Sequence, residues 1–566
     1  MRLRHFPLIA AAFAFGSCAS PIHSAPAAVP GMVSAADPRA AEAGAEMLRK
    51  GGSAVDAAFA TLLALNVVEP ESSGIGGGGY LVYSQAGGAP VTFDGRETAP
   101  HAATGTWFYN NGQPMEHSEA IPGGKSVGVP GNLRMMALAH KRYGKLPWAA
   151  LFQPAIRLAR DGFKITPRLY NALNQFRRTG AMSPEARVLF YGADGNPLPV
   201  GTLVKNPTFA AFLEGIAARG ADSFYVGPNA QAIVATVNGS PLHPSQMTTG
   251  DIASYDAEPR SPVCGTYRGY RICGMGPSTS GGIAVFQTLK QLERFNLSAL
   301  GPNSPIAWHL IAESERLAYA DRDRYLGDID YVSVPIAGLM DPAYLASRSS
   351  LISPDRSIAT AVAGNPPGAP KMTCSAAPVQ ERGTSHFVAV DSQGNVASET
   401  STIESVFGSG LMVSGYYLNN ELTDFNIVPD KNGCLTANRV EGGKRPRSSM
   451  SPTIVWGPDG HVRLAVGAAG GATIPAQVIK AIIGVVDWHL TAQQAIALPM
   501  IYAPGDTIFV ESGTFLESMI PQLRALGHTN IRTVPPGTFK ANAIEWLHGR
   551  WVGGADPRSE GVALSQ

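Results

Sequence analysis

The chain has 566 residues, of which 45% are hydrophobic and 15% charged, so it can bury a large core in one big domain or several smaller ones. Lysine and arginine number 44 against 43 aspartate and glutamate, which gives a formal net charge of +1. Because no basic run is present that would track a phosphate backbone, the composition argues against nucleic acid as a partner.

The first residues have the pattern of a secretory signal. A basic start is followed by an apolar run over residues 6–15 and then by small residues. We expect residues 1–25 to be a signal peptide that is cleaved near residues 24–25, with lipidation of Cys18 as the alternative. No later stretch approaches the about 20 apolar residues that span a bilayer, so we expect an exported protein with no transmembrane segment in its mature form.

Two helices open the predicted fold. The segment after Asp37-Pro38 has an N-cap, a proline at its first helical position and Gly51 at its end. Ser53 begins the next helix, with Asp56 three residues on, as in a capping box.

Strands and helices then alternate in blocks along the chain. Residues 80–93 predict a hairpin, and residues 130–350 are rich in helical spacing. Residues 355–382 lack periodicity and contain many proline, alanine and serine residues, which indicates an exposed segment. Strands return after it, and two helices follow within residues 475–499. Strands at both ends with helices between and after them predict one α+β layered domain.

Four cysteines remain once Cys18 is set aside. Cys264 and Cys273 lie on two short strands around a turn, so we expect them to pair across a hairpin; free buried thiols are the alternative. Cys374 and Cys434 complete the set. None of the spacings is C-x-x-C, so neither a redox motif nor a zinc knuckle is indicated.

Several motifs resemble known sites but lack the required context. Residues 74–79 satisfy G-x-G-x-x-G, yet a helix precedes the run and a strand follows it, the reverse of a dinucleotide site. Residues 124–126 read Gly-Lys-Ser, but Glu119 stands where a P-loop requires glycine, and no strand precedes them as in a nucleophile elbow. The twelve histidines show no H-E-x-x-H, so no metal site is predicted.

Thr384 is the candidate nucleophile. It follows Gly383 at the end of the exposed segment and begins an alternating apolar run. A threonine hydroxyl needs a base, and the α-amine of the same residue would serve if an internal cut before Thr384 released it. The hydroxyl could make that cut itself by attacking the preceding carbonyl, where glycine gives the least obstruction. An ordinary turn before a strand is the alternative interpretation.

The chain as a whole resembles the γ-glutamyltransferase (glutathione hydrolase) proenzymes, which are N-terminal-nucleophile hydrolases. The resemblance covers nearly the whole mature chain and rests on ordered matches: "GGSAVDAAFATLLALNVVEPESSGIGGGGYLVY", "DGRETAP", "SVGVPG", "YRGYRICGMGPSTSGG", "GTSHFVAVDSQGN", "LNNELTDF", "RPRSSMSPTIV", "GAAGGATI" and "GGADPRS".

The resemblance implies a four-layer αββα sandwich of the N-terminal nucleophile hydrolase type. It also implies self-cleavage before Thr384, which would leave a large subunit of residues 26–383 and a small subunit of residues 384–566 as a heterodimer. No cofactor and no metal is implied.

Site residues follow from the matched positions. Thr384 corresponds to the nucleophile, and Thr402 to the threonine that orients it. Other matched side chains belong to the site for the substrate's α-carboxylate, with which they can form hydrogen bonds or an ion pair. Acidic side chains match the site for the substrate's α-ammonium group. Backbone N–H groups of two glycines match the oxyanion hole. The remaining matched residues are Arg96, Ser448 and Ser449 for the carboxylate, Glu421 and Asp424 for the ammonium, and Gly470 and Gly471 for the oxyanion.

Simpler interpretations exist for single residues of this set. Asp424 would otherwise be a turn residue, the two serines would cap a bend, and the two glycines would form a strand-to-helix turn. His386 lies on the same strand face as Thr384. Because the amine already fills the role of the base, we expect His386 to be a packed, hydrogen-bonded strand residue.

Two features depart from the family pattern. Glu404 stands where many members have asparagine, which adds a third carboxylate near the α-ammonium and favours donors with a free amine over glutaryl groups. The loop of residues 425–447 lacks the aromatic residue found there in many bacterial members, which suggests a more open pocket with room for bulkier donors. Cys434 in this loop is a hypothetical disulfide partner of Cys374.

The predicted function is that of an exported, self-processing γ-glutamyl hydrolase/transferase. It would cleave glutathione and related γ-glutamyl compounds through an ester on Thr384 and pass the acyl group to water, an amino acid or a peptide. The alternatives are a glutaryl- or cephalosporin-type amidohydrolase with the same machinery and, more distantly, a non-catalytic exported amino-acid-binding protein.

Overall fold

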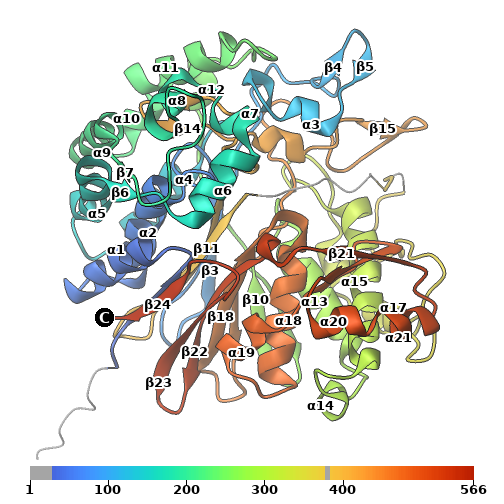
Figure 1. Cartoon of the computed structure of the whole chain (residues 1–566). Helices are drawn as coiled ribbons and strands as arrows, with labels where there is room; N and C mark the ends of the chain where they lie inside the picture. The colour runs from blue at the N-terminus through green and yellow to red at the C-terminus, as the bar shows by residue number, and fades with distance from the viewer. Residues whose placement is uncertain (1–28, 372, 376–382) are drawn as a thin grey trace, which may run out of the picture.

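The computed structural model describes residues 29–371, 373–375 and 383–566 (Figure 1). The predicted signal peptide and the alternative lipidation of Cys18 therefore lie outside the described residues. Across the described ranges, no helix combines the length and the apolar character needed to cross a membrane.

The first of two central sheets carries the segment around Thr384. Its seven strands run antiparallel, and β11, which begins directly after Thr384, is near the middle. Its strands, in spatial order, are β24 (Val562–Ser565), β1 (Met32–Ala35), β11 (Ser385–Val390), β12 (Val396–Thr402), β2 (Gly78–Ser84), β3 (Pro90–Asp94) and β8 (Glu258–Arg260).

The second sheet has six antiparallel strands and packs against the first, with β11 and β12 facing β18 and β22. Its order is β23 (Arg550–Ala555), β22 (Lys540–Leu547), β18 (Val462–Ala469), β17 (Thr453–Trp456), β10 (Tyr270–Gly274) and β9 (Val263–Tyr267).

Helices cover the outer face of each sheet, so the layers run α, β, β, α (Figure 1). On the first sheet lie α1 (Pro38–Arg49) and α2 (Ala54–Val68), with α4 (Asn132–Tyr143), α5 (Trp148–Asp161) and α9 (Pro207–Arg219) around them. On the second lie α13 (Gly281–Leu292), α15 (Pro305–Tyr325), α18 (Ile474–Val486) and α19 (Ala492–Ala497). This is the α+β four-layer sandwich predicted from the sequence.

Alternation along β11 divides its side chains between two cores. Phe387 and Ala389 join the cluster under α1 and α2, whereas Val388 and Val390 join the cluster between the sheets. Both faces of the strand therefore pack against an apolar core. Thr384 directly precedes this strand.

Local signals in the sequence predicted several elements correctly. Asp37 caps α1 by accepting from Arg39 N at 2.8 Å, and Ser53 and Asp56 form the predicted capping box of α2. The predicted hairpin is β2–β3, with Tyr80 opposite Asp94. In the predicted exposed segment, residues 355–371 and 373–375 form neither helix nor strand. Its other residues, 372 and 376–382, lie outside the described residues.

Both expected cysteine pairs form disulfides. Cys264 faces Cys273 across the β9–β10 hairpin, with a Cα–Cα distance of 4.2 Å. Cys374 is joined to Cys434, with a Cα–Cα distance of 5.8 Å, as hypothesised for the loop of residues 425–447.

The glycine motifs are structural, as expected. The run of residues 74–79 leads from the end of α2 into β2, where a Cβ on Gly77 would collide with the carbonyl of Thr402. The backbone of the run therefore approaches β12 more closely than any side chain would allow. Residues 124–126 form a single 3₁₀ turn.

Candidate active site

Thr384 is poised against the peptide bond that precedes it. Its side chain is buried, and its hydroxyl donates to the carbonyl oxygen of Gly383. The Thr402 hydroxyl, from the end of β12, donates to the same oxygen at 2.8 Å and lies 3.3 Å from Thr384 Oγ1. Two hydroxyls therefore converge on one carbonyl, which polarises it toward nucleophilic attack.

The residues after β12 hold this arrangement in place. Glu404 N donates to Thr402 Oγ1 at 2.7 Å, so the Thr402 hydroxyl accepts one hydrogen bond and directs its own hydrogen to Gly383 O. Gly383 N in turn donates to Glu404 O. A Cβ on Gly383 would collide with that carbonyl, so only glycine fits at this position.

A cavity opens beside Thr384, and we call it the Thr384 cavity. Strand ends and loops from residues far apart in the chain line it. Its lining residues are Arg96, Gly383, Thr384, Thr402, Glu404, Glu421, Asp424, Ser448 and Met450.

Arg96 is the cation of the Thr384 cavity. It follows β3 and is buried, and it donates to the carboxylates of Glu421 and Asp424, both on the 3₁₀ turn η2 (Glu421–Asp424). Its guanidinium also donates to the carbonyls of Pro446 and Arg447, at 3.1 Å each. Burial opposes the charge of Arg96, but the two carboxylates outweigh it and raise its pKa well above the ordinary value.

Acidic groups outnumber the cation that faces them. Besides Glu421 and Asp424, Glu404 reaches the cavity and accepts a hydrogen bond from Asn420 Nδ2. Glu97, next to Arg96, is buried behind them. Burial raises the pKa of Glu97 to about 8, and burial together with the charges of Glu97 and Glu404 raises the pKa of Glu421. A ligand ammonium in the cavity would find several carboxyl oxygens as hydrogen-bond acceptors.

Ser448 and Ser449 lie on the loop before β17, and only the first lines the cavity. Met450 N donates to Ser448 Oγ at 3.1 Å. Ser449 Oγ accepts from Arg322 Nη2 at 2.6 Å, on the side toward α15. The two predicted carboxylate ligands are therefore adjacent but are supported by different donors.

Gly470 and Gly471 directly follow β18 and are not among the residues that line the cavity. Both have positive φ, 121° and 58°, which favours glycine. They lead through the turn η3 (Gly471–Thr473) into the N-terminus of α18. The structure therefore brings seven of the ten predicted site residues together around the cavity and leaves Ser449, Gly470 and Gly471 just beyond its lining.

His386 is a packed strand residue, as expected. It is fully buried between the sheets against Gly467, and its Nδ1 lies 2.8 Å from Thr400 Oγ1. Burial lowers its pKa to about 3, so the ring is neutral at physiological pH.

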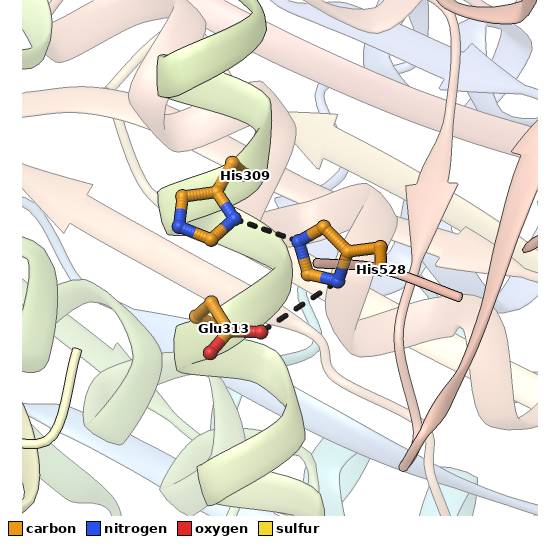
Figure 2. Close-up of side chains that lie close together, drawn as sticks. All are labelled: His309, Glu313 and His528. Atoms are coloured by element: carbon orange, nitrogen blue, oxygen red, sulfur yellow. Dashed lines mark hydrogen bonds and ion pairs between the residues drawn. The ribbon is translucent and has the colours of Figure 1, made fainter. Parts of the chain in front are cut away.

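A second buried polar group lies away from the cavity, and we call it the His309 cluster (Figure 2). His309 and Glu313 project from one face of α15, and His528 follows α21 (Ile520–Ala525). Within the described ranges, these three residues form the one set whose ligand atoms are close enough to hold a metal ion together.

The hydrogen bonds of the His309 cluster argue against a metal. His309 Nε2 lies 2.8 Å from the carbonyl of Ser353 and so donates, which leaves His309 Nδ1 to accept from His528 Nε2 at 2.7 Å. Glu313 accepts from Arg316 at 2.5 Å and from Ile358 N at 2.6 Å. The nitrogens that face each other share one proton, and both carboxylate oxygens accept from donors outside the histidine pair, while His528 Nδ1 lies 3.8 Å from Glu313 Oε1.

Four residues around the cavity were not predicted from the sequence. Glu97 adds a buried carboxyl, Asn420 orients Glu404, and Arg322 and Ser280 support the serine loop. The available signals were a charged residue next to Arg96 and an arginine in the last turn of α15. Neither signal shows burial without the tertiary structure.

Comparison with known proteins shows the family of the chain. The family model described as Gamma-glutamyltranspeptidase matches residues 40–565. The glutathione hydrolase proenzyme of Bacillus subtilis (strain 168) is 36% identical over 545 residues, which cover 94% of this chain and 91% of the relative. The Acylase ACY 1 proenzyme of Pseudomonas sp. (strain SE83) is 33% identical over 547 residues, covering 94% and 93%.

A solved structure agrees over nearly the whole length. The crystal structure of cephalosporin acylase from Bacillus halodurans aligns with a TM-score of 0.83 and 27% identity, covering 98% of this chain and 99% of that one. The fold is thus that of the N-terminal-nucleophile hydrolases, and the chain belongs to the gamma-glutamyltranspeptidase family.

Proposed function

We propose that the protein is a self-processing γ-glutamyl hydrolase/transferase acting on glutathione and related γ-glutamyl compounds. The observation that carries the proposal is the contact of the Thr384 hydroxyl with the Gly383 carbonyl, at the edge of a cavity that holds one guanidinium and several carboxylates. The family and its glutathione hydrolase relatives support the same activity.

Self-cleavage is the first step of the proposal. Thr384 Oγ1 attacks the carbonyl carbon of Gly383, its proton passes to the departing amide nitrogen, and the peptide bond becomes an ester on the Thr384 side chain. Water hydrolyses that ester, which frees the Thr384 amine and leaves residues 26–383 and 384–566 as two chains. The 2.8 Å hydrogen bond from Thr402 stabilises the charge that develops on Gly383 O.

The freed amine then becomes the base. Its ordinary pKa of about 7.7 lies near working pH, and it is attached to the residue whose hydroxyl it must deprotonate. Thr384 attacks the γ-carbonyl of the donor, the amine carries the proton to the leaving amine, and a γ-glutamyl ester forms. Water or the amine of an amino acid or peptide then takes the acyl group. Backbone N–H groups of Gly470 and Gly471 are assigned to the oxyanion.

Charge complementarity orients the donor. We assign its α-carboxylate to Arg96, Ser448 and Ser449, and its α-ammonium to the acidic side chains. Binding would transfer Arg96 from its carboxylate neighbours to the ligand carboxylate and give the acidic side chains an ammonium partner. The acidic side chains are Glu404, Glu421 and Asp424.

An acylase acting on glutaryl side chains is the second candidate, because an acylase and a cephalosporin acylase are among the similar proteins. A glutaryl group keeps the terminal carboxylate but lacks the amine. The acidic surplus in the Thr384 cavity favours a donor with an ammonium, and this is why we prefer the γ-glutamyl assignment. The more open pocket expected from the loop of residues 425–447 remains a prediction about donor size.

Export forms part of the proposal. The start of the chain has the pattern of a signal peptide, which would place the enzyme in the periplasm or outside the cell. Disulfides of the kind formed by Cys264 with Cys273 persist in such compartments.

The decisive experiment is intact-mass spectrometry of the wild type beside Thr384→Ala. We expect two fragments that separate between Gly383 and Thr384 in the wild type, and one unbroken chain in the variant. The purified wild type should then release p-nitroaniline faster from a γ-glutamyl than from a glutaryl anilide. An uncut wild type without activity would overturn the proposal in favour of a binding protein, and the opposite donor preference would favour the acylase.

A further inference from the structure

We propose that Arg322 is a positioning residue that turns the Ser449 hydroxyl into a hydrogen-bond donor for the donor's α-carboxylate. This inference rests on the proposed function and assigns a role to a residue outside the Thr384 cavity. Arg322 lies on α15 and is only 2% exposed.

The geometry fixes the direction of each hydrogen bond. Arg322 Nη2 lies 2.6 Å from Ser449 Oγ, and Nε lies 2.9 Å from Ser280 Oγ. A guanidinium can only donate, so Ser449 Oγ accepts in this bond and its own hydrogen must point to another acceptor. A bond from a cation also polarises the hydroxyl and makes it a stronger donor.

The hydroxyl of the neighbouring Ser448 also accepts a hydrogen bond from a supporting donor. Met450 N donates to Ser448 Oγ at 3.1 Å, so this hydroxyl hydrogen is also directed away from its supporting N–H group. When the donor binds, two adjacent hydroxyls that each accept from a supporting N–H group can each turn to donate to one oxygen of its carboxylate. A carboxylate accepts only, which matches this arrangement.

Ser280 links Arg322 to the backbone of the same loop. The Ser280 hydroxyl accepts from Arg322 and donates to the carbonyl of Ser448 at 2.7 Å, and Thr279 Oγ1 donates to Met450 O at 2.7 Å. Arg322 itself is held by Asp323, whose Oδ1 lies 2.8 Å from Nη1. The guanidinium therefore supports one serine through its side chain and the other through its backbone.

The test compares Arg322→Lys with wild type on γ-glutamyl p-nitroanilide. Lysine keeps the charge but cannot contact both hydroxyls, so we expect KM to rise about tenfold or more with a much smaller change in kcat. Activity on 4-aminobutyryl p-nitroanilide, which has the amine but no carboxylate, should change little, so that the preference between the two donors shrinks. Arg324→Lys, two residues along α15 and bonded to Thr373 O, is the matched control and should behave as wild type.

Other outcomes separate this inference from the proposed function. If the wild-type protein is inactive on the γ-glutamyl donor, the proposed function is refuted, regardless of how the variants behave. An active wild type with an unchanged KM in Arg322→Lys overturns the role of Arg322, as does an equal loss on both donors. If Arg322→Lys fails to cleave itself, Ser280→Ala tests the same support, and an unchanged KM there refutes it.

A separate observation carries a second inference. Cys374 precedes Gly383, whereas Cys434 lies in the loop of residues 425–447. Their disulfide is reinforced by backbone pairing of Cys374 with Thr436. Because cleavage before Thr384 would put the two cysteines on different chains, we infer that this disulfide joins the large and small subunits covalently. The other disulfide, Cys264–Cys273, lies within the large subunit and cannot do so.

The covalent link also anchors the wall of the Thr384 cavity. Beyond Cys434, Asn438 Nδ2 donates to the carbonyl of Asp424 at 2.6 Å, and Asn438 Oδ1 accepts from Arg447 N at 2.8 Å. The disulfide therefore restrains the hairpin of β15 (Asp430–Lys431) and β16 (Cys434–Leu435), and the end of that loop holds the backbone of two residues at the site.

Denaturing electrophoresis with and without reductant tests the link. The cleaved wild type should run as one species without reductant and as two with it, while Cys374→Ser should give two under both conditions. Cys264→Ser is the matched control and should behave as wild type. A cleaved wild type that separates without reductant refutes the link, whereas an uncut wild type refutes the proposed cleavage instead.

Discussion

The Thr384 cavity and the His309 cluster are both buried and polar, but only in the cavity do several acidic side chains share one arginine. In the His309 cluster, each carboxylate oxygen of Glu313 has a donor, and Arg316 is shared with Asp506 at 2.6 Å. In the cavity, Arg96 faces Glu404, Glu421 and Asp424 together. The comparison teaches that a surplus of acidic groups over cations, rather than burial or the presence of histidine, distinguishes the proposed binding site from the His309 cluster.

Removing the cation of the cavity should have the largest effect. Arg96→Gln leaves the buried carboxylates without their counter-charge and removes the guanidinium that would bind the α-carboxylate of the donor. We therefore expect kcat/KM for the γ-glutamyl donor to fall about 10²-fold or more. Steady-state kinetics on the cleaved enzyme measures this, with Arg134→Gln, a partly exposed arginine paired to Asp222, as the control. A loss below threefold would contradict the assignment of Arg96.

Reducing the negative surplus should change donor choice rather than abolish activity. Asp424→Asn keeps the shape but removes one charge from the side that we assign to the ammonium, so kcat/KM for the γ-glutamyl anilide should fall about tenfold relative to the glutaryl anilide. Asp430→Asn, on the exposed β15, is the control and should leave the ratio unchanged. An equal fall in kcat/KM for both anilides would show that Asp424 does not recognise the α-ammonium of the donor.

Burial of a carboxyl group beside the cavity should make stability depend on pH. The pKa of Glu97 is raised to about 8 by burial, so the folded protein holds a proton that the unfolded chain releases near the ordinary pKa of 4.5. Stability is therefore lost as pH rises from about 4.5 to about 8. In the uncut Thr384→Ala background, Glu97→Gln should flatten the fall of Tm over this window, whereas exposed Glu116→Gln should not. Parallel Tm curves would refute the raised pKa.

Local chemistry explains which parts could be predicted from the sequence. The capping box of Ser53 and Asp56 and the Cys264–Cys273 hairpin depend on residues a few positions apart, so their patterns are visible in the chain. The ligand residues around Thr384 came from the resemblance, because Arg96 and Asp424 meet only in the folded protein. Arg322 and Ser449 are 127 positions apart, and nothing in the α15 pattern distinguishes the buried Arg322 from the less buried Arg324.

The smallest effect on activity is expected at the His309 cluster. His528→Ala removes one hydrogen bond and leaves a small buried void, so we expect a loss of about 2–4 kcal/mol in unfolding free energy, seen as a lower Tm, with KM for the donor unchanged. Because the facing histidine nitrogens and both Glu313 oxygens already have hydrogen-bond partners, dialysis against EDTA should change neither Tm nor activity. A Tm that falls on chelation and recovers with Zn²⁺ would show that the cluster holds a metal, and the contrast with the cavity would then rest on the ion rather than on balanced hydrogen bonds.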